Sequence, residues 1–184
     1  MTFEFTMLNY CLRSDIMDMR EVRLEKITVN IGAGESGERL NKAKTILERI
    51  TNRTAVLTKA RKRVQAFGIK KGDTIGVKVT LRGKAAEEFL SKALDAVDYK
   101  LNKRSIDKDG NFAFGVKEYI DFPGAKYDPS IGILGFDVCG TMMRPGKRVE
   151  KRRRLKSKIK HTHKVTPEET ENFLKNKFKV NFYE

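Results

Sequence analysis

The chain has 184 residues, which suits one domain with its own apolar core and some extensions, and argues against two full-sized domains. Its formal net charge of +15 makes nucleic acid or an anionic membrane surface the first class of partner to consider. Two cysteines outside any paired motif, together with no membrane-length apolar run and no signal-peptide pattern, argue against secreted and membrane-spanning classes and predict a cytoplasmic protein.

The positive charge is concentrated in two segments. The first basic segment, residues 53–84, holds ten Lys and Arg against one Asp, and the second basic segment, residues 144–164, holds eleven against one Glu. The rest of the chain has 18 basic and 22 acidic side chains. Two dense patches on a nearly neutral body indicate a nucleic-acid footprint, whereas solvated lysine-rich faces remain the simpler alternative.

The first elements are expected in the N-terminal third. Residues 1–19 predict either a short helix or an ordered arm. Alternation of apolar and polar residues predicts a strand over 23–31. A glycine-rich turn follows, and apolar residues at helical spacing predict a helix over 38–50 with Ser36 as its N-cap.

The middle of the chain predicts a strand pair, a helix and a further strand. Strands are expected over 54–58 and 73–82, joined by a long cationic loop at residues 60–74. A helix over 84–97 follows, because its apolar residues form one stripe. An Asp-Gly-Asn turn signal then precedes a strand over 112–116.

The C-terminal part combines one more strand, the second basic segment and a helix. A strand is expected over 133–141. The second basic segment lacks the apolar residues needed to form a core by itself, so we expect it to order only when a partner neutralises it. A capping-box pattern that begins at Thr166 predicts a helix over 167–176, and residues 179–182 predict a possible edge strand.

These elements predict an α+β fold: a mostly antiparallel sheet of about five strands, with helices on one face and a polar, basic open face. We expect one domain over 1–184, with the basic extension and the C-terminal helix as appendages. The open face would display hydroxyl, amide and cationic groups that can bond to ribose, phosphate and base edges: Thr28, Asn30, Lys78, Thr80 and Arg82.

One motif suggests an alternative function, a nucleotide-binding enzyme. Residues 32–37 match G-x-G-x-x-G between a strand and a helix. Glu35 within the loop would repel a pyrophosphate, and the acidic ribose ligand expected near Leu57 is absent. A tight strand-to-helix turn explains the glycines more simply.

No other pattern carries catalytic or metal chemistry. His161 and His163 lack accompanying Cys or acidic ligands and lie among lysines, so they suit an RNA-facing run better than a metal site. Cys139 has no triad partner. The sequence therefore predicts a non-enzyme without cofactor or metal.

Five motifs, in order along the chain, resemble the large-subunit ribosomal protein five family, which binds 5S rRNA. They are EKITVNIGAGE at 25–35, AVLTKARKRV at 55–64, GIKKGDTIGVKVTLRG at 68–83, DGNFAFGVKE at 109–118 and FPGAKYD at 122–128. The second basic segment is similar to that of the archaeal and eukaryotic branch of the family. The resemblance covers about residues 19–141 and the last helix.

The resemblance implies a set of partners and contact residues. It implies 5S rRNA next to the open face, with the recognition residues carried over to Asn30 and Thr80, and with Arg53 near the position of a family Gln. It implies that the 60–74 loop reaches P-site tRNA through Arg61, Lys62, Arg63, Lys70 and Lys71. Further RNA contacts are expected from the second basic segment: Arg144, Lys147, Arg148, Lys151, Arg152, Arg153 and Arg154. The other implied partners are 23S-type rRNA, a neighbouring 5S-binding ribosomal protein and a protein of the small-subunit head, with no membrane partner.

Overall fold

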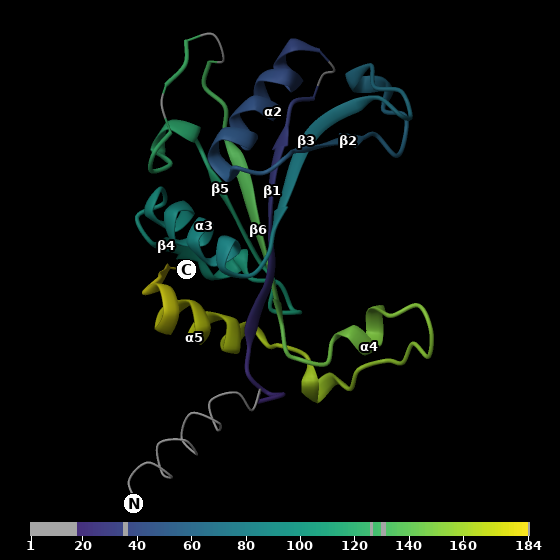
Figure 1. Ribbon diagram of the computed structural model, residues 1–184, viewed down its shortest axis with the longest axis vertical. Helices are drawn as coiled ribbons and strands as arrows, with labels where there is room; N and C mark the ends of the chain where they lie inside the picture. The colour runs from purple at the N-terminus through teal and green to yellow at the C-terminus, as the bar shows by residue number, and fades with distance from the viewer. Residues whose placement is uncertain (1–17, 35–36, 126, 130–131, 184) are drawn as a thin grey trace, which may run out of the picture.

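The fold is a twisted antiparallel sheet with helices packed against one face (Figure 1). The computed structural model describes residues 18–34, 37–125, 127–129 and 132–183. The expectations for residues 1–17 and for Ser36 as an N-cap lie outside these residues. The arrangement confirms the predicted α+β class and the antiparallel sheet.

The sheet has five strands in the order β2-β3-β1-β6-β5, and all of its neighbours pair antiparallel. Its strands are β1 Arg23–Gly32, β2 Val56–Lys59, β3 Thr74–Leu81, β5 Phe112–Val116 and β6 Phe136–Met143. The long strand β1 is central because it pairs with β3 on one side and β6 on the other. Alternation along β1, β3 and β6 sends every second side chain into the core, as the sequence predicts.

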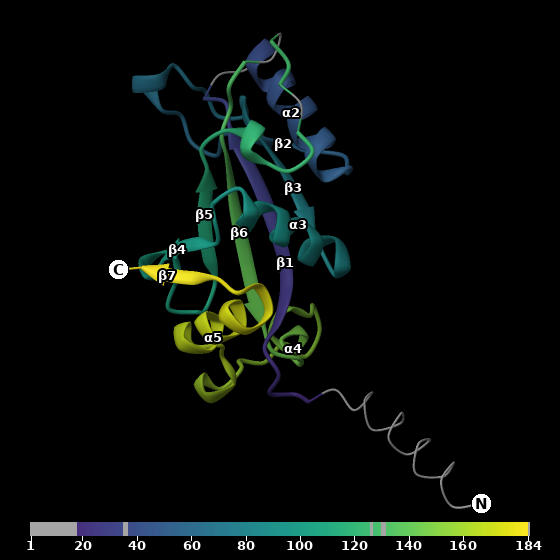
Figure 2. The ribbon, with the colours of Figure 1, turned by 90° about the vertical axis from the view of Figure 1, so that its left-hand side faces the viewer.

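Helices cover one face of this sheet. They are α2 Glu38–Thr51, α3 Lys84–Asp95 and α5 Pro167–Phe178, with the four-residue α4 Arg148–Lys151 set apart from them. Figure 2 looks onto this side, and the three longer helices lie in front of the strands. The described part of the chain also contains short 3-10 turns: Gln65–Phe67, Lys103–Ser105, Tyr119–Asp121 and His161–His163. None of the described helices is long and apolar enough to cross a bilayer.

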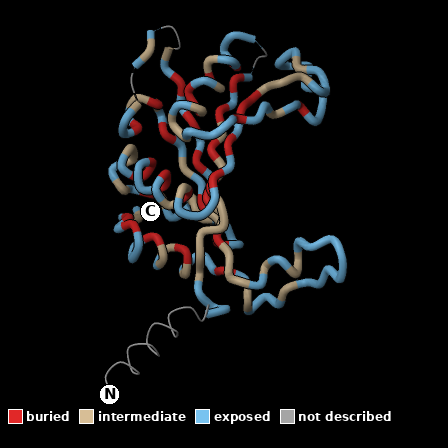
Figure 3. Tube along the Cα trace, viewed as in Figure 1, coloured by how far each residue is buried: buried red, intermediate tan, exposed pale blue. Residues whose placement is uncertain are grey.

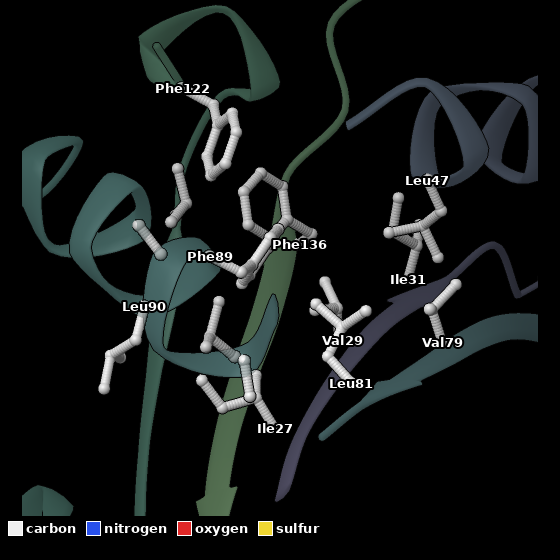
Figure 4. Close-up of a cluster of buried hydrophobic side chains, with 14 of the residues drawn as sticks. Ile27, Val29, Ile31, Leu47, Val79, Leu81, Phe89, Leu90, Phe122 and Phe136 are labelled. Atoms are coloured by element: carbon white, nitrogen blue, oxygen red, sulfur yellow. The ribbon is translucent and has the colours of Figure 1, made fainter. Parts of the chain in front are cut away.

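The core lies between the sheet and these helices (Figure 4). Phe122 links helix to strand, because its ring stacks on Phe89 of α3 with centroids 5.2 Å apart and meets Phe136 of β6 edge-on at 6.0 Å. Leu47 of α2 packs on the other half of the sheet beside Ile31. These three longer helices cover only one face of the sheet and leave the opposite face uncovered (Figures 1 and 2).

The C-terminal helix begins as its sequence predicts. The Thr166 hydroxyl accepts from the Glu169 amide, and the Glu169 carboxylate accepts from the Thr166 amide at 3.1 Å, which completes the capping box. Residues 181–183 form the strand that the sequence predicts over 179–182, but it lies in a separate sheet and not at the edge of the main one. They form β7 Asn181–Tyr183, which pairs parallel with β4 Lys100–Asn102 in a separate two-stranded sheet.

Two of the boundaries that differ from the prediction follow from local backbone geometry. Helix α3 ends at Asp95, since Asp98 and Tyr99 take left-handed conformations and the Tyr99 amide bonds back to the Leu94 carbonyl at 2.9 Å. Strand β6 begins three residues late. The backbone of Gly135 lies so close to the Lys117 carbonyl oxygen that a Cβ on residue 135 would come within 2.6 Å of that oxygen. Pairing in the sheet begins only at the next residue, Phe136.

Candidate nucleic-acid interface

Four of the five polar residues that the sequence assigned to the uncovered face lie on the paired strands β1 and β3. Thr28 lies opposite Thr80, and Asn30 lies opposite Lys78, in the β1–β3 register. The threonine and lysine of β3 are exposed, whereas Thr28 and Asn30 are half-buried. The four side chains therefore form two adjacent rows across the centre of the sheet. We call these two rows, together with the neighbouring residues of β6, the open face.

Strand β6 adds residues to the open face that the sequence analysis had not included in the site. Asp137 lies opposite Asn30, and Cys139 lies opposite Thr28. Cys139 is exposed, but partial desolvation, and then the nearby charge of Asp137, raise the pKa of its thiol. The alternation of apolar and polar residues along β6 indicates that Asp137 and Cys139 face away from the core. The sequence does not indicate which strand pairs with β6, so these two residues could not be assigned to the site. Because Asp137 adds a negative charge to the open face, attraction to RNA phosphates depends on the cations of the two basic segments.

The first basic segment contains a hairpin with more internal order than its glycines suggest. Amide and carbonyl groups of Val64 and Ile69 bond to each other at 3.0 and 3.1 Å, and Ala60 and Asp73 are joined at 2.8 Å. The Asp73 carboxylate also accepts from the Lys70 amide at 2.8 Å. The five predicted cations of this loop, Arg61, Lys62, Arg63, Lys70 and Lys71, are exposed.

Phe67 at the tip of this hairpin is 76% exposed, the most exposed phenylalanine in the described part of the chain. Phe67 was not among the contact residues expected from the sequence. An exposed aromatic ring among cations is suited to stacking on a nucleic-acid base. Its sequence neighbours are basic and glycine-rich, and this composition was the signal that could have identified Phe67 as an exposed RNA-contacting residue.

Acidic residues from three different parts of the chain hold the second basic segment against the rest of the domain. Arg144 pairs with Glu169 of α5, Lys164 Nζ lies 3.1 Å from Asp109 Oδ1, and Lys151 Nζ lies 2.5 Å from Glu25 Oε1. The ring Nε2 of His163 lies 2.9 Å from the Pro145 carbonyl oxygen, and this bonds the two ends of the segment together. The segment thus has local structure despite its lack of apolar residues.

Part of each basic segment projects on the side of the sheet opposite the helices. In Figure 1 the hairpin of the first segment lies at the upper right and the part around α4 at the lower right, with α3 and α5 at the left and α2 at the top centre. Figure 3 shows both projections as mostly exposed chain. Two cation-rich arms therefore flank the open face.

The predicted cations differ in their availability. Lys147 is half-buried, whereas the others near α4 are exposed: Arg148, Lys151, Arg152, Arg153 and Arg154. The Arg144 side chain is only 11% exposed, and its guanidinium bonds to Glu169 and to the Thr162 carbonyl. Arg82 lies 3.8 Å from Glu25 at the end of β3. Arg53 is exposed in the connection between α2 and β2, outside the strands of the open face.

The strand topology does not fit the dinucleotide-binding alternative. That motif requires parallel strands on either side of its helix, whereas β1 pairs antiparallel with both of its neighbours. Ala33 and Gly34 instead donate to the Ile75 carbonyl at 3.0 and 3.1 Å and continue the β1–β3 pairing. Among the residues that the structure describes, no group of three or more His, Cys, Asp and Glu is placed to hold a metal ion.

Comparison with known proteins gives concordant matches over most of the chain. Residues 18–70 match the family model of ribosomal protein L5, and residues 74–181 match the model of the C-terminus of the ribosomal L5 family. The archaeal relatives are named large ribosomal subunit protein uL5. That of Sulfolobus acidocaldarius is 51% identical over 90% of this chain and 93% of its own. That of Sulfurisphaera tokodaii is 52% identical over 90% and 94%, and that of Methanococcoides burtonii 50% over 88% and 96%.

Proposed function

Because the chain belongs to the ribosomal protein L5 family, we propose that it binds 5S rRNA through the open face of its sheet. As a member of this family it is a structural constituent of the large ribosomal subunit and not an enzyme. The nucleotide-binding enzyme alternative is therefore withdrawn. What remains to be assigned is which surface binds which RNA.

One observation carries the assignment of the surface: the uncovered face lies between two cation-rich arms on the same side of the molecule (Figure 1). The cations supply sequence-independent attraction to phosphates. The hydroxyl and amide groups of Thr28, Asn30 and Thr80 supply hydrogen bonds that can select ribose hydroxyls or base edges. A-form RNA displays these groups in a wide, shallow minor groove, which the uncovered face of a sheet can approach.

The hairpin at residues 60–73 is a separate contact in this proposal, directed at P-site tRNA. Its five exposed cations meet phosphates without selecting a sequence, as contact with many different tRNAs requires. The second basic segment contributes further contacts to 5S rRNA or to 23S-type rRNA. A neighbouring 5S-binding ribosomal protein and a protein of the small-subunit head complete the proposed partners, in a cytoplasmic ribosome.

The experiment that tests this function is direct binding of the purified chain to isolated 5S rRNA with tRNA as competitor. We expect the chain to stay bound to 5S rRNA when tRNA is present in excess. If about six phosphates are neutralised, affinity should also fall by ~10³ between 50 and 200 mM salt. Equal competition by tRNA would contradict specific 5S recognition, and an affinity that does not change with salt would contradict the role of the basic segments.

A further inference from the structure

Glu25 occupies an irregular position in the central strand. In the β1–β6 register, Leu24 lies opposite Met142 and Lys26 opposite Thr141, so Glu25 is an extra residue between consecutive pairs. Such a bulge turns a side chain away from the regular alternation. The bulge therefore places the acidic side chain of Glu25 at a position that regular strand pairing would not give it.

The Glu25 carboxylate lies where the two basic segments meet. Its Oε1 is 2.5 Å from Lys151 Nζ of the second segment and 3.8 Å from a terminal guanidinium nitrogen of Arg82 of the first. The side chain is only 8% exposed, while the lysine and arginine that it contacts are 49% and 63% exposed. Its other oxygen, Oε2, is buried without a hydrogen-bond partner among the described residues. A buried acid thus holds two cations at the surface.

The charges around Glu25 keep it ionised. Burial by itself raises the pKa of the carboxyl, but the hydrogen bond and positive charge of Lys151 outweigh burial and hold that pKa below its usual range. Lys147 and Lys26 add further positive charge nearby. If the carboxylate were removed, these cations would face one another without a counter-charge.

We propose that Glu25 is the positioning residue that docks the second basic segment beside the first, so that the two form one RNA-binding surface. The inference rests on the proposed function and adds the residue through which that surface is assembled. The ends of the second segment are braced elsewhere, by Arg144 with Glu169 and by Lys164 with Asp109. Of the three acidic contacts, that of Glu25 alone reaches α4, and it alone is shared with the first segment.

The alternative role of Glu25 is that of a simple counter-charge, and the two roles predict opposite effects of its loss. A counter-charge weakens the attraction to any RNA, so its removal should strengthen binding to folded and unstructured RNA alike. A positioning residue sets where the cations lie. Its removal should weaken binding to a folded RNA that requires this arrangement, while binding to a flexible RNA is preserved or strengthened.

The test compares Glu25→Gln with Glu21→Gln, which removes the same charge from an exposed acid that pairs locally with Arg23. Affinities for 5S rRNA and for poly(U) are measured at one ionic strength. We expect Glu25→Gln to weaken 5S rRNA binding about tenfold without weakening poly(U) binding, and Glu21→Gln to change neither by more than about twofold. Tighter binding of both RNAs by Glu25→Gln, or an unchanged affinity for 5S rRNA, would overturn the proposal.

A second readout needs no RNA. The stretch at 152–160 is rich in trypsin sites, and its rate of cleavage reports whether α4 is docked. We expect faster cleavage in Glu25→Gln and in Lys151→Met, with little further increase in the double variant, because both changes break one contact. Cleavage at the wild-type rate in Glu25→Gln would overturn the proposal. If wild-type protein fails to select 5S rRNA over tRNA, the proposed function fails, whereas a docking defect on trypsin treatment would still stand.

Discussion

The ring of Phe112 lies directly over the backbone of Gly140, its partner across the β5–β6 pair. A Cβ added to Gly140 would overlap this ring, and Phe112 is only 2% exposed and packed into the core. The contact fixes β5 against β6 on the core side. It thereby sets the position of Cys139 and its neighbours on the open face.

Gly140→Ala should therefore destabilise the protein. The added methyl group forces the Phe112 ring or the strands to move, which typically costs about 1–3 kcal/mol of unfolding free energy. Gly115→Ala is the matched control in the same strand pair, because its Cβ would make only an ordinary contact, 3.5 Å from Asp137 Oδ1. Urea unfolding of the purified proteins measures both, and equal midpoints for the two variants would contradict this packing.

Asn30→Ala and Thr80→Ala should weaken 5S rRNA binding without lowering the unfolding midpoint. Both side chains lie on the open face, away from the core, and loss of a hydrogen bond in an interface costs roughly 1–3 kcal/mol. Ser91→Ala removes an exposed polar group from α3 on the helical side and serves as the control. Normal binding by both open-face variants would place the RNA on a different surface.

Cys139 provides a chemical probe of the same face. In a Cys11→Ser background, we expect alkylation of Cys139 to be slowed several-fold by saturating 5S rRNA, since the thiol lies in the row that contains Thr28. The thiolate is the reactive form, and partial desolvation followed by Asp137 raises the pKa of this thiol. Its alkylation should thus accelerate at higher pH than that of a free thiol. An identical rate with and without 5S rRNA would show that the RNA leaves this row uncovered.

Removal of the hairpin cations should affect tRNA more than 5S rRNA. The variant replaces Arg61, Lys62, Arg63, Lys70 and Lys71 with Ser. We expect near-normal 5S rRNA binding and incorporation into large subunits, because the open face is intact, and weaker retention of P-site tRNA in assembled ribosomes.

The control for the hairpin variant removes the same charge elsewhere. It replaces exposed cations outside both basic segments: Arg39, Lys92, Lys100, Lys108 and Lys117. We expect it to retain P-site tRNA normally. If the hairpin variant cannot bind 5S rRNA, the hairpin is part of the rRNA site and the proposed separation of roles is wrong.

The main elements could be predicted because their signals are local. Alternation along β1 and β3 identifies which residues face the core and which face outward, and the capping box identifies the start of α5. The sequence also places both charge-dense segments and carries the motifs of the ribosomal family. It could not predict the β4–β7 pair, because strands of three residues carry almost no periodicity and pair across about 80 positions.

The assembly of the interface depended on contacts between distant residues. Glu25 and Lys151 are 126 positions apart, and each reads locally as an ordinary surface charge. The fold buries the acid, draws Arg82 and Lys151 to it, and turns Arg144 inward toward Glu169. Arg144 and Lys151 lie in the same basic run, and their charges alone do not distinguish them. Only tertiary packing buries Arg144 against Glu169 and leaves Lys151 exposed, because burial and pairing depend on neighbours that no local pattern encodes.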